Sequence, residues 1–272
     1  MNLLFFCPRW GSEDLSWDKF MNKVKAAGYA GIEFGIHNDM LVAEIEQVWQ
    51  KAEQYGLKLI AQHYATYVSD FEQHCEIFAG WFEKIRPFKF YKIDTQTGKD
   101  YFTFSQNQKL ISIGADFEAS TGIKVLHETH RNKFAFAAHI TKEYLEQIPA
   151  LQITLDISHW VCVAESYLED QEEAVQLAIA RTEHIHARVG YPEGPQIPDP
   201  RVPEWQEALN NHIAWWDQIV ELKKARNEDV TITPEFGPAP YLVALPFTRQ
   251  PITNQWEVNE YMMNLLKTRY AH

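Results

Sequence analysis

Four segments of the sequence end in residue types that can hold a metal ion or move a proton. The first is Leu126-His-Glu-Thr-His-Arg131, which follows an apolar run, and three similar segments come later in the chain. Together they supply three carboxylates and one imidazole, a set that favours a hard or borderline divalent ion such as Mn²⁺, Mg²⁺, Co²⁺ or Zn²⁺. The sequence predicts one divalent metal ion per chain, held by Glu128, Asp156, His186 and Glu235.

The elements that must position these residues alternate short apolar runs with longer amphipathic stretches. In the longer stretches hydrophobic residues recur at helical spacing, and two of them stop at the helix C-caps Gly28 and Gly56. Eight such units predict an α/β fold, a single-domain (β/α)8 TIM barrel over residues 1–272. The predicted strands are 3–9, 31–35, 58–64, 90–97, 124–130, 153–159, 184–190 and 230–236.

An open doubly wound sheet is the rival fold. It would need a GxGxxG phosphate-binding turn after the first strand, where the chain instead reads Cys7-Pro-Arg-Trp-Gly11. The spacing of the four ligands also favours the barrel, because the first two separations match one strand–helix unit. The third separation is longer by a proline-rich insertion at 190–203, which we expect to be a stiff loop that helps to select the substrate.

The composition narrows the partners and the compartment. A net charge of −12 argues against a nucleic-acid partner, because a polyanion would be repelled on average. The three cysteines form neither a CxxC pair nor a disulfide framework, which indicates a reducing compartment. No apolar run approaches the roughly 18 residues of a membrane span, and the first one is too short for a signal peptide. We expect a cytoplasmic protein without a membrane partner; nothing in the sequence opposes a homo-oligomer.

Barrel geometry explains why polar residues would follow apolar strands. Catalytic side chains of a TIM barrel lie at the C-terminal ends of the strands, and side chains alternate between the interior and the outer layer. By this alternation Glu128 shares a face with His130, and His184 and Arg188 share a face with His186. One polar strand end is usually just solvated, but four on successive strands indicate one shared rim.

These residues resemble the xylose isomerase-like TIM-barrel superfamily of sugar isomerases and epimerases, which also contains inosose dehydratases and the endonuclease IV group. The resemblance covers nearly the whole chain and rests on the ordered series Glu, Asp-x-x-His, His and Glu that begins at Glu128, and on Gly28-Tyr-Ala-Gly-Ile-Glu33. It implies that His159 and Arg188 bind the substrate. After the metal histidine the chain reads Ala-Arg-Val, where the family usually has an acidic residue.

The two glutamates predict the reaction. Strands five and eight are three steps apart around the ring, so Glu128 and Glu235 are expected to face each other across a bound carbohydrate. A metal-polarised carbonyl makes the neighbouring C–H acidic, one glutamate removes the proton, and the other returns one. We therefore expect a metal-dependent sugar isomerase or epimerase that works through an enediolate on a small-molecule carbohydrate.

Several other polar residues have two interpretations. His130 is predicted to contact the substrate, and His63 is predicted either to line the pocket or to be a hydrogen-bonded core histidine. Glu33 is a pocket residue or part of an ion pair at the barrel floor, whereas Lys99 and Arg131 are expected to be solvated. Aromatic residues at strand ends are expected to wall the cavity or fill the core: Trp10, Trp160 and Phe236.

Three other functions compete with the isomerase. An inosose-type dehydratase begins with the same proton abstraction and then loses water. A three-metal endonuclease would need further histidines on strands three and four, but strand four ends in Ile93-Asp-Thr-Gln-Thr97. It would also need Asp-x-His after strand seven, where the loop offers Asp199-Pro-Arg201. A non-catalytic sugar-binding barrel would not need a complete ligand set.

Overall fold

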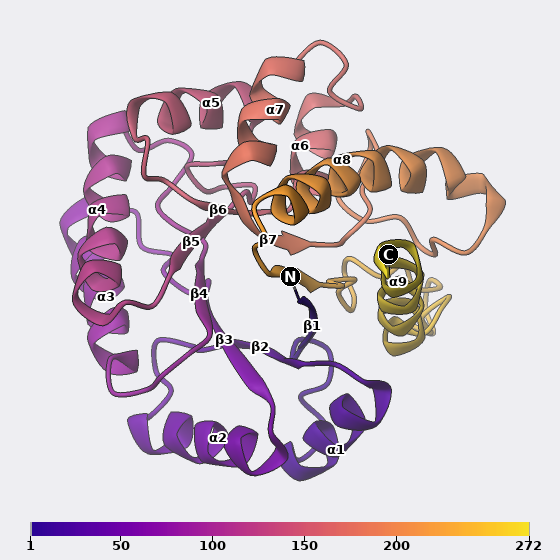
Figure 1. Cartoon of the computed structure of the whole chain (residues 1–272), viewed down its shortest axis with the longest axis horizontal. Coiled ribbons are helices and arrows are strands. Elements are labelled where there is room, and N and C mark those ends of the chain that lie inside the picture. The colour runs from indigo at the N-terminus through magenta and orange to yellow at the C-terminus, as the bar shows by residue number, and fades with distance from the viewer. Residues whose placement is uncertain (1, 272) are drawn as a thin grey trace.

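Eight parallel strands form the closed barrel that the sequence predicts. The computed structural model describes residues 2–271, and in it the strands pair in chain order, with β8 returning to β1 (Figure 1). The chain therefore folds as a single-domain TIM barrel. The strands are β1 (Leu3–Pro8), β2 (Gly31–Gly35), β3 (Lys58–His63), β4 (Lys92–Thr95), β5 (Val125–Glu128), β6 (Ile153–Leu155), β7 (Thr182–His186) and β8 (Val230–Thr233).

Helices follow the strands and surround the barrel (Figure 1). None of those between residues 2 and 271 is long and apolar enough to cross a membrane. They are α1 (Trp17–Ala27), α2 (Val42–Tyr55), α3 (Phe71–Ile85), α4 (Phe104–Thr121), α5 (Ala138–Gln147), α6 (Ile157–Ala164), α7 (Glu172–Arg181), α8 (Gln206–Ala225) and α9 (Gln255–Tyr270), with a 3₁₀ turn at Pro203–Trp205 before α8.

The helix ends are set by local sequence. Gly28 and Gly56 cap α1 and α2 in the left-handed conformation, with φ of 83° and 67°, so both predicted C-caps are confirmed. Polar residues at the other ends accept hydrogen bonds from backbone N–H groups that would otherwise lack partners. These N-cap residues are Ser16, Asp70, Thr103 and Asn254.

Strand six is shorter than the sequence predicts. The strand expected over 153–159 ends at Leu155, and the remainder belongs to α6. Asp156 starts this helix, because its Oδ1 accepts a hydrogen bond from the Ser158 N–H at 3.1 Å. A buried helix and a buried strand show the same continuous apolar pattern, which is why the sequence did not separate them.

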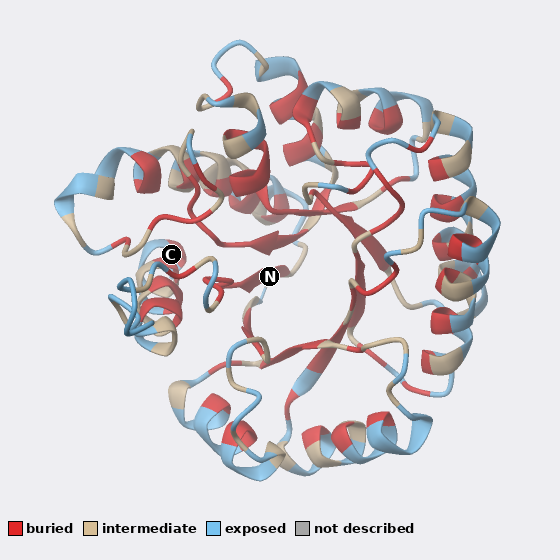
Figure 2. Cartoon of the chain, turned by 180° about the vertical axis from the view of Figure 1, so that it is seen from behind, coloured by how far each residue is buried: buried red, intermediate tan, exposed pale blue. Residues whose placement is uncertain are grey.

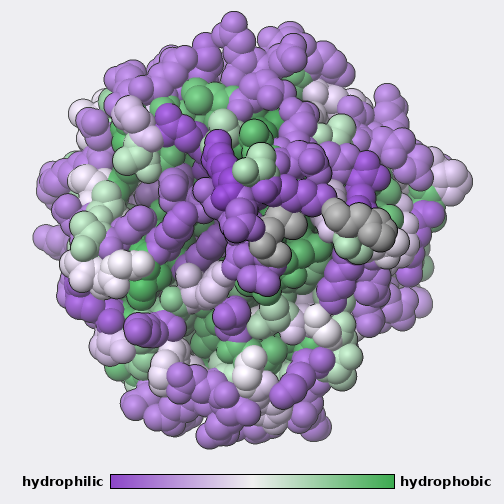
Figure 3. All heavy atoms as spheres, in the orientation of Figure 1, coloured by the Kyte–Doolittle hydropathy of each residue, from purple (hydrophilic) through white to green (hydrophobic). Residues whose placement is uncertain are grey.

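Buried residues concentrate on the strands and on the sides of the helices that face them (Figure 2). Most of the hydrophobic core lies between the barrel and the helices, where Trp160 and Phe236 are buried. The Trp160 indole N–H donates to the Ala135 carbonyl at 2.9 Å, so this ring belongs to the core. On the face drawn in Figure 3, hydrophilic residues cover most of the rim, and hydrophobic residues show between them toward the middle.

Candidate metal centre and active site

A cavity of about 610 Å³ opens at the C-terminal ends of the strands. This is the end of a TIM barrel at which active sites form. The cavity takes residues from both halves of the barrel, with aromatic and amide side chains beside charged ones. Among those lining it are Trp10, Glu33, Tyr64, Gln96, His130, Arg188, Glu235 and Tyr241.

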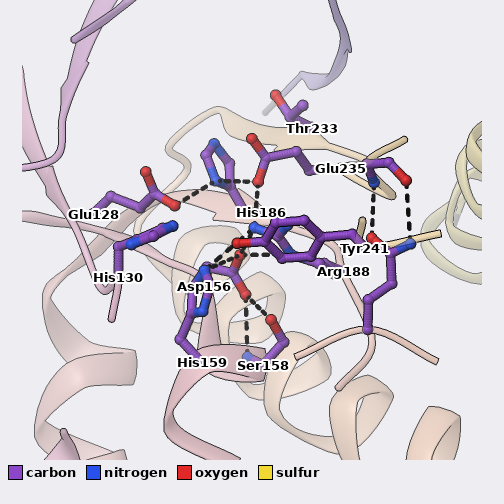
Figure 4. A network of polar contacts seen from close by, with 12 residues as sticks. Glu128, His130, Asp156, Ser158, His159, His186, Arg188, Thr233, Glu235 and Tyr241 are labelled. Atoms are coloured by element: carbon purple, nitrogen blue, oxygen red, sulfur yellow. Dashed lines mark hydrogen bonds and ion pairs between the residues drawn. The ribbon is translucent and has the colours of Figure 1, made fainter. Parts of the chain in front are cut away.

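The four predicted metal ligands lie together next to this cavity. Glu128, Asp156, His186 and Glu235 are all buried, and each offers one donor atom within 4.8 Å of the others. The His186 Nδ1 atom lies 3.5 Å from Glu128 Oε1 and 2.9 Å from Glu235 Oε2 (Figure 4). The structure thus brings together four residues that are far apart in sequence.

Each ligand is placed by the end of one strand. Glu128 and His186 are the last residues of β5 and β7, and Glu235 follows β8 by two positions. Asp156 follows β6 directly, and Thr129 ties it to the end of β5. The Thr129 Oγ1 donates to the Asp156 carbonyl at 2.9 Å and accepts from the Asp156 N–H at 2.8 Å. This exchange of hydrogen bonds fixes the third ligand relative to the first.

The chemistry of the cluster fits a divalent cation. Both carboxylate oxygens of Glu128 are buried and have no hydrogen-bond partner among residues 2–271. Buried polar atoms without a partner are rare, because each costs free energy, and a bound cation would supply one. Three carboxylates and one imidazole nitrogen are ligands that Mn²⁺, Mg²⁺, Co²⁺ and Zn²⁺ accept. The cluster can therefore hold a metal ion.

Arg188 shares the charge of two of the four ligands. Its Nη2 lies 2.5 Å from Asp156 Oδ2 and 2.9 Å from Glu235 Oε2 (Figure 4). Burial lowers the pKa of Arg188, but Asp156 and Glu235 outweigh burial and raise it above its usual value. The second guanidinium nitrogen, Nη1, is buried and has no hydrogen-bond partner within the described chain, so it is free to meet a substrate oxygen.

Glu33 fixes the other side of the His186 ring. Its two carboxylate oxygens lie 3.0 and 3.1 Å from His186 Nε2, and it also accepts a hydrogen bond from Thr233. A proton on Nε2 leaves Nδ1 directed at the carboxylates of the cluster. Burial lowers the pKa of His186, but Glu235 and Glu33 outweigh it and hold that pKa well above its usual value. Both interpretations of Glu33 therefore hold: it pairs with His186, and it also lines the cavity.

Two histidines lie beside the cluster. The rings of His130 and His159 are 4.0 Å apart, and His159 Nε2 lies 3.4 Å from Arg188 Nη2. Burial holds the pKa of His159 well below its usual value, so its ring is neutral at pH 7. His130 lines the cavity, and its Nδ1 donates to the Arg131 carbonyl. Of the two, His130 lines the cavity, whereas His159 is fully buried beside it.

The structure does not bring His63 to this site. Its ring is fully buried, with centroids 4.9 Å from Phe78 and 5.1 Å from Trp81, and its Nε2 is 2.8 Å from Thr66 Oγ1. Burial lowers its pKa well below the usual value. Of its two predicted interpretations, the geometry agrees with the hydrogen-bonded core histidine, because α3 packs over the outward-facing end of β3.

Two residues near the site were not singled out from the sequence. Asp94 on β4 is fully buried, and its Oδ2 lies 3.8 Å from His186 Nε2. Burial and the neighbouring Glu128 raise the pKa of Asp94 well above its usual value. Its signal was a carboxylate in the middle of a predicted strand. Tyr241 places its ring centre 4.8 Å from the Arg188 guanidinium, and its irregular loop carries no periodic signal.

Trp10 and Tyr241 form one wall of the cavity. Their rings meet edge to face, with centroids 5.3 Å apart at 88°. Gly237 makes room for this wall, because a Cβ atom there would lie 2.1 Å from the Trp10 ring. Of the three aromatic residues expected to wall the cavity or fill the core, Trp10 therefore lines the cavity.

Two expectations about surface residues are corrected. Lys99 is only 4% exposed, so it is not a solvated lysine, and Arg131 is half-buried with its Nη2 3.3 Å from the Tyr241 hydroxyl.

The proline-rich stretch 190–203 does not line the cavity. Instead its Gln196 exchanges two hydrogen bonds with the Gly237 backbone, at 2.7 and 3.2 Å. That loop supports the one that follows β8.

Comparisons with known proteins bear on the fold. No protein-family model and no curated protein matches the sequence. The probable 3-DHS dehydratase AsbF of Bacillus anthracis matches in structure with a TM-score of 0.61 and 20% identity, over 98% of this chain and 99% of that one. A D-psicose 3-epimerase matches with a TM-score of 0.63 and 12% identity, over 99% and 100%.

A third similar structure is a sugar phosphate isomerase/epimerase from Parabacteroides distasonis ATCC 8503. Its TM-score is 0.59 at 12% identity, and the match covers 98% of this chain and 94% of that one. These matches extend over nearly the full length of each chain, at identities that show the fold alone. The chain therefore has the fold of the xylose isomerase-like TIM-barrel enzymes.

Proposed function

We propose that the protein is a divalent-metal-dependent isomerase or epimerase that moves a proton at the carbon next to the carbonyl of a sugar or sugar derivative. The observation that supports this most is the placement of Glu128 and Glu235. Glu128 ends β5 and Glu235 follows β8, the two lie on either side of the His186 Nδ1 atom, and Glu235 lines the cavity. A substrate carbon between two carboxylates can lose a proton to one and regain one from the other.

The chain's own residues divide the work. A divalent ion held by the four ligands would polarise the substrate carbonyl and stabilise the enediolate. The pKa of Glu235 is raised by burial, but His186 and Arg188 outweigh burial and lower it, so this carboxylate is ionised at pH 7. Glu128 has no hydrogen-bond partner for either oxygen within residues 2–271. With one oxygen on the ion, the other would be free to take a proton. Arg188, which lines the cavity, and His159 next to it would bind substrate oxygens.

The shape of the cavity suits a polar ring or chain of sugar size. The perpendicular rings of Trp10 and Tyr241 form an aromatic wall, and Gln62, Tyr64 and Gln96 offer amide and hydroxyl groups from the opposite side. Such a combination of flat aromatic faces with a few polar groups orients small ligands through contacts and hydrogen bonds. These features support a carbohydrate as the substrate class.

Dehydration is the alternative reaction on the same site. An inosose-type dehydratase would use the same proton abstraction and then expel a hydroxyl from the adjacent carbon. The endonuclease hypothesis finds no support in the cavity, since His63 is buried against Phe78 and Trp81 and β4 ends in Thr95 without a histidine. A non-catalytic sugar-binding barrel would leave the paired glutamates without a role.

Deuterium exchange separates these functions. The protein would be loaded with Mn²⁺ and incubated in D₂O with a panel of ketoses, aldoses and inososes, and each compound followed by proton NMR. We expect deuterium at the α-carbon of one class, with an isomeric product for an isomerase or epimerase and an unsaturated product for a dehydratase. The variant with both Glu128→Gln and Glu235→Gln is the control. No exchange with any class, or equal exchange by the control, would refute the proposal.

A further inference from the structure

Two lysines are buried next to the cavity. Lys99, in the loop after β4, is 4% exposed, and Lys133, in the loop after β5, is 3% exposed. Strands β4 and β5 are neighbours, so both loops leave the same part of the rim that carries Glu128. The two ammonium groups converge under Tyr67, because each Nζ lies 5.9 Å from the centre of that ring.

Neither ammonium group has a counter-ion in the described chain. No carboxylate of residues 2–271 forms an ion pair with Lys99 or Lys133, and the Lys133 Nζ is buried without a hydrogen-bond partner. Every other lysine that is buried to this degree has oxygen partners: Lys92 donates to the Glu183 carbonyl and Thr231, and Lys223 pairs with Glu183. An unpaired buried charge is costly, so the pair needs an anion.

Like-charge repulsion adds to that cost. Burial and the charge of Lys99 lower the pKa of Lys133 to about 8, although the charges of Glu128 and Asp100 offset part of this. The Tyr67 ring contributes little, since 5.9 Å is near the outer limit of a cation–π contact. The two charges are therefore not explained by contacts within the fold.

The backbone holds both lysines in place. The Asn107 side chain accepts from the Lys99 N–H at 3.3 Å and donates to the Lys99 carbonyl at 3.0 Å. The Lys133 N–H donates to the His130 carbonyl at 3.2 Å, and the next N–H in that loop donates to the Thr97 carbonyl at the same distance. The loops are thus tied to each other and to the helix behind them, which preorganises the two ammonium groups.

The pair lies behind the part of the cavity wall that Tyr67 forms. Tyr67 lines the cavity, is 62% exposed, and covers both ammonium groups. His130 also lines the cavity, and it belongs to the same short loop as Lys133. A ligand that meets Glu128 with one carbon can extend along this wall toward β4.

We propose that Lys99 and Lys133 form an anion subsite that binds the phosphate or carboxylate group of the substrate. The inference rests on the proposed function and names its substrate class: a sugar phosphate or a sugar acid, not a neutral sugar. An anionic oxygen group between the two lysines removes their repulsion and accepts charge-assisted hydrogen bonds from both. The distance of this anion subsite from the metal cluster would determine which carbon of the substrate lies between Glu128 and Glu235.

Binding of inorganic phosphate tests the subsite without any turnover. The full-length protein would be kept in EDTA, so that no metal ion binds the anion, and melted at rising phosphate concentration. We expect phosphate to raise the melting temperature of the wild type and to bind Lys133→Met at least roughly tenfold more weakly. Lys19→Met, which changes an exposed lysine on α1, should respond like the wild type.

The melting temperature without phosphate provides a second readout. Lys133→Met keeps the aliphatic stem and removes an unpaired buried charge, so it should melt no lower than the wild type in anion-free buffer. A wild type that does not respond to phosphate, or a Lys133→Met protein that responds as strongly as the wild type, would overturn the inference. A large loss of stability on Lys133→Met would do the same, since it would show that the ammonium group has a structural partner.

A kinetic comparison separates this inference from the proposed function. Deuterium exchange would be measured with fructose, fructose 6-phosphate and fructuronate as neutral, phosphorylated and carboxylated probes. We expect one of the anionic probes to have the lowest KM, and Lys99→Met to raise that KM roughly tenfold or more while leaving the neutral probe unchanged. Exchange with the neutral probe alone would overturn the anion subsite and leave the proposed function standing. The more active anionic probe identifies phosphate or carboxylate.

Discussion

The barrel half from β5 to β8 and the half from β1 to β4 contribute different chemistry to the cavity. The later half supplies the four clustered donors and Arg188, all of them buried, and Arg188 pairs with two of the donors. The earlier half supplies mainly uncharged lining, such as Trp10, Gln62, Tyr64 and Gln96. Under the proposed function, the later half would carry out the proton transfer and the earlier half would recognise the shape of the substrate.

The two halves are joined by contacts that orient the charged cluster. Glu33 on β2 holds His186 Nε2, and Asp94 on β4 lies 3.8 Å from the same atom. Gln62 on β3 donates to Glu235 Oε1 at 3.5 Å. Each of these three groups lies next to a residue of the metal cluster, either His186 or Glu235. Substitutions in the earlier half should therefore change orientation and affinity, whereas those in the later half should remove the reaction.

The largest expected effect comes from the acid–base pair. Glu235→Gln should lower kcat for α-proton exchange by roughly 10²–10⁴, because an amide cannot accept the proton. The matched substitution in the other half is Glu13→Gln, since Glu13 also lines the cavity. We expect it to change kcat less than tenfold in the same NMR assay. Similar losses from both substitutions would show that the halves do not divide the work.

Metal affinity should fall next. Asp156→Asn keeps the shape of the side chain but removes its charge. The Kd for Mn²⁺ should rise by at least roughly 100-fold, because a ligand should cost no less than a residue that only orients one. His159→Asn, three residues further along the chain, should weaken the metal far less, because His159 is assigned to the substrate. Isothermal titration with Mn²⁺ would measure both. If His159→Asn weakened Mn²⁺ binding more than Asp156→Asn, then His159 would be the metal ligand and Asp156 the substrate contact.

Acid sensitivity should come from the later half as well. Burial lowers the pKa of His212 to about 4, and its ring accepts from the Gly190 N–H at 3.1 Å. The unfolded histidine, with a pKa of about 6.5, binds more protons between these values, so stability is lost as pH falls from 6.5 toward 4.

Replacing this histidine tests that loss. Between pH 8 and pH 5 His212 accounts for about 2 kcal/mol of unfolding free energy, which His212→Gln should remove from the pH dependence. Urea unfolding at both pH values would measure it. The exposed His139→Gln serves as the control and should keep the wild-type difference. An unchanged difference in His212→Gln would show that its ring is already protonated in the fold.

The smallest effect is expected from the aromatic wall. Trp10→Leu removes a flat face that packs against Tyr241, so KM should rise by roughly tenfold while kcat stays within about threefold. Steady-state kinetics on the substrate found by deuterium exchange would measure both constants. A loss confined to kcat would show that Trp10 takes part in the proton transfer. The two halves would then not divide the work as described.

Much of the fold could be predicted because its pattern is local. Hydrophobic periodicity and the caps at Gly28 and Gly56 are set by residues close in sequence, and the structure confirms them. The ligand cluster could be predicted as a hypothesis, because parallel strands of a barrel end at one rim. The position of Glu128 on β5 thus constrains where Asp156 must lie one unit later.

Other features depend on packing between distant segments. The burial of Lys99 follows from Asn107 holding its backbone and from the loop after β5, and neither contact leaves a periodic trace in the sequence. The same holds for Tyr241, whose loop has no regular structure around the site. His63 could not be assigned between pocket and core, because that depends on how α3 packs over β3.

The most direct measurement is an anomalous difference map from crystals of the protein soaked with Mn²⁺. The account predicts one peak per chain, bound by one atom each of Glu128, Asp156, His186 and Glu235. Two other groups of donors in the fold provide the contrast: Glu33 with His184 and His186, and Glu128 with His130 and His159. A peak at either of these groups, or no peak at all, would contradict the central claim.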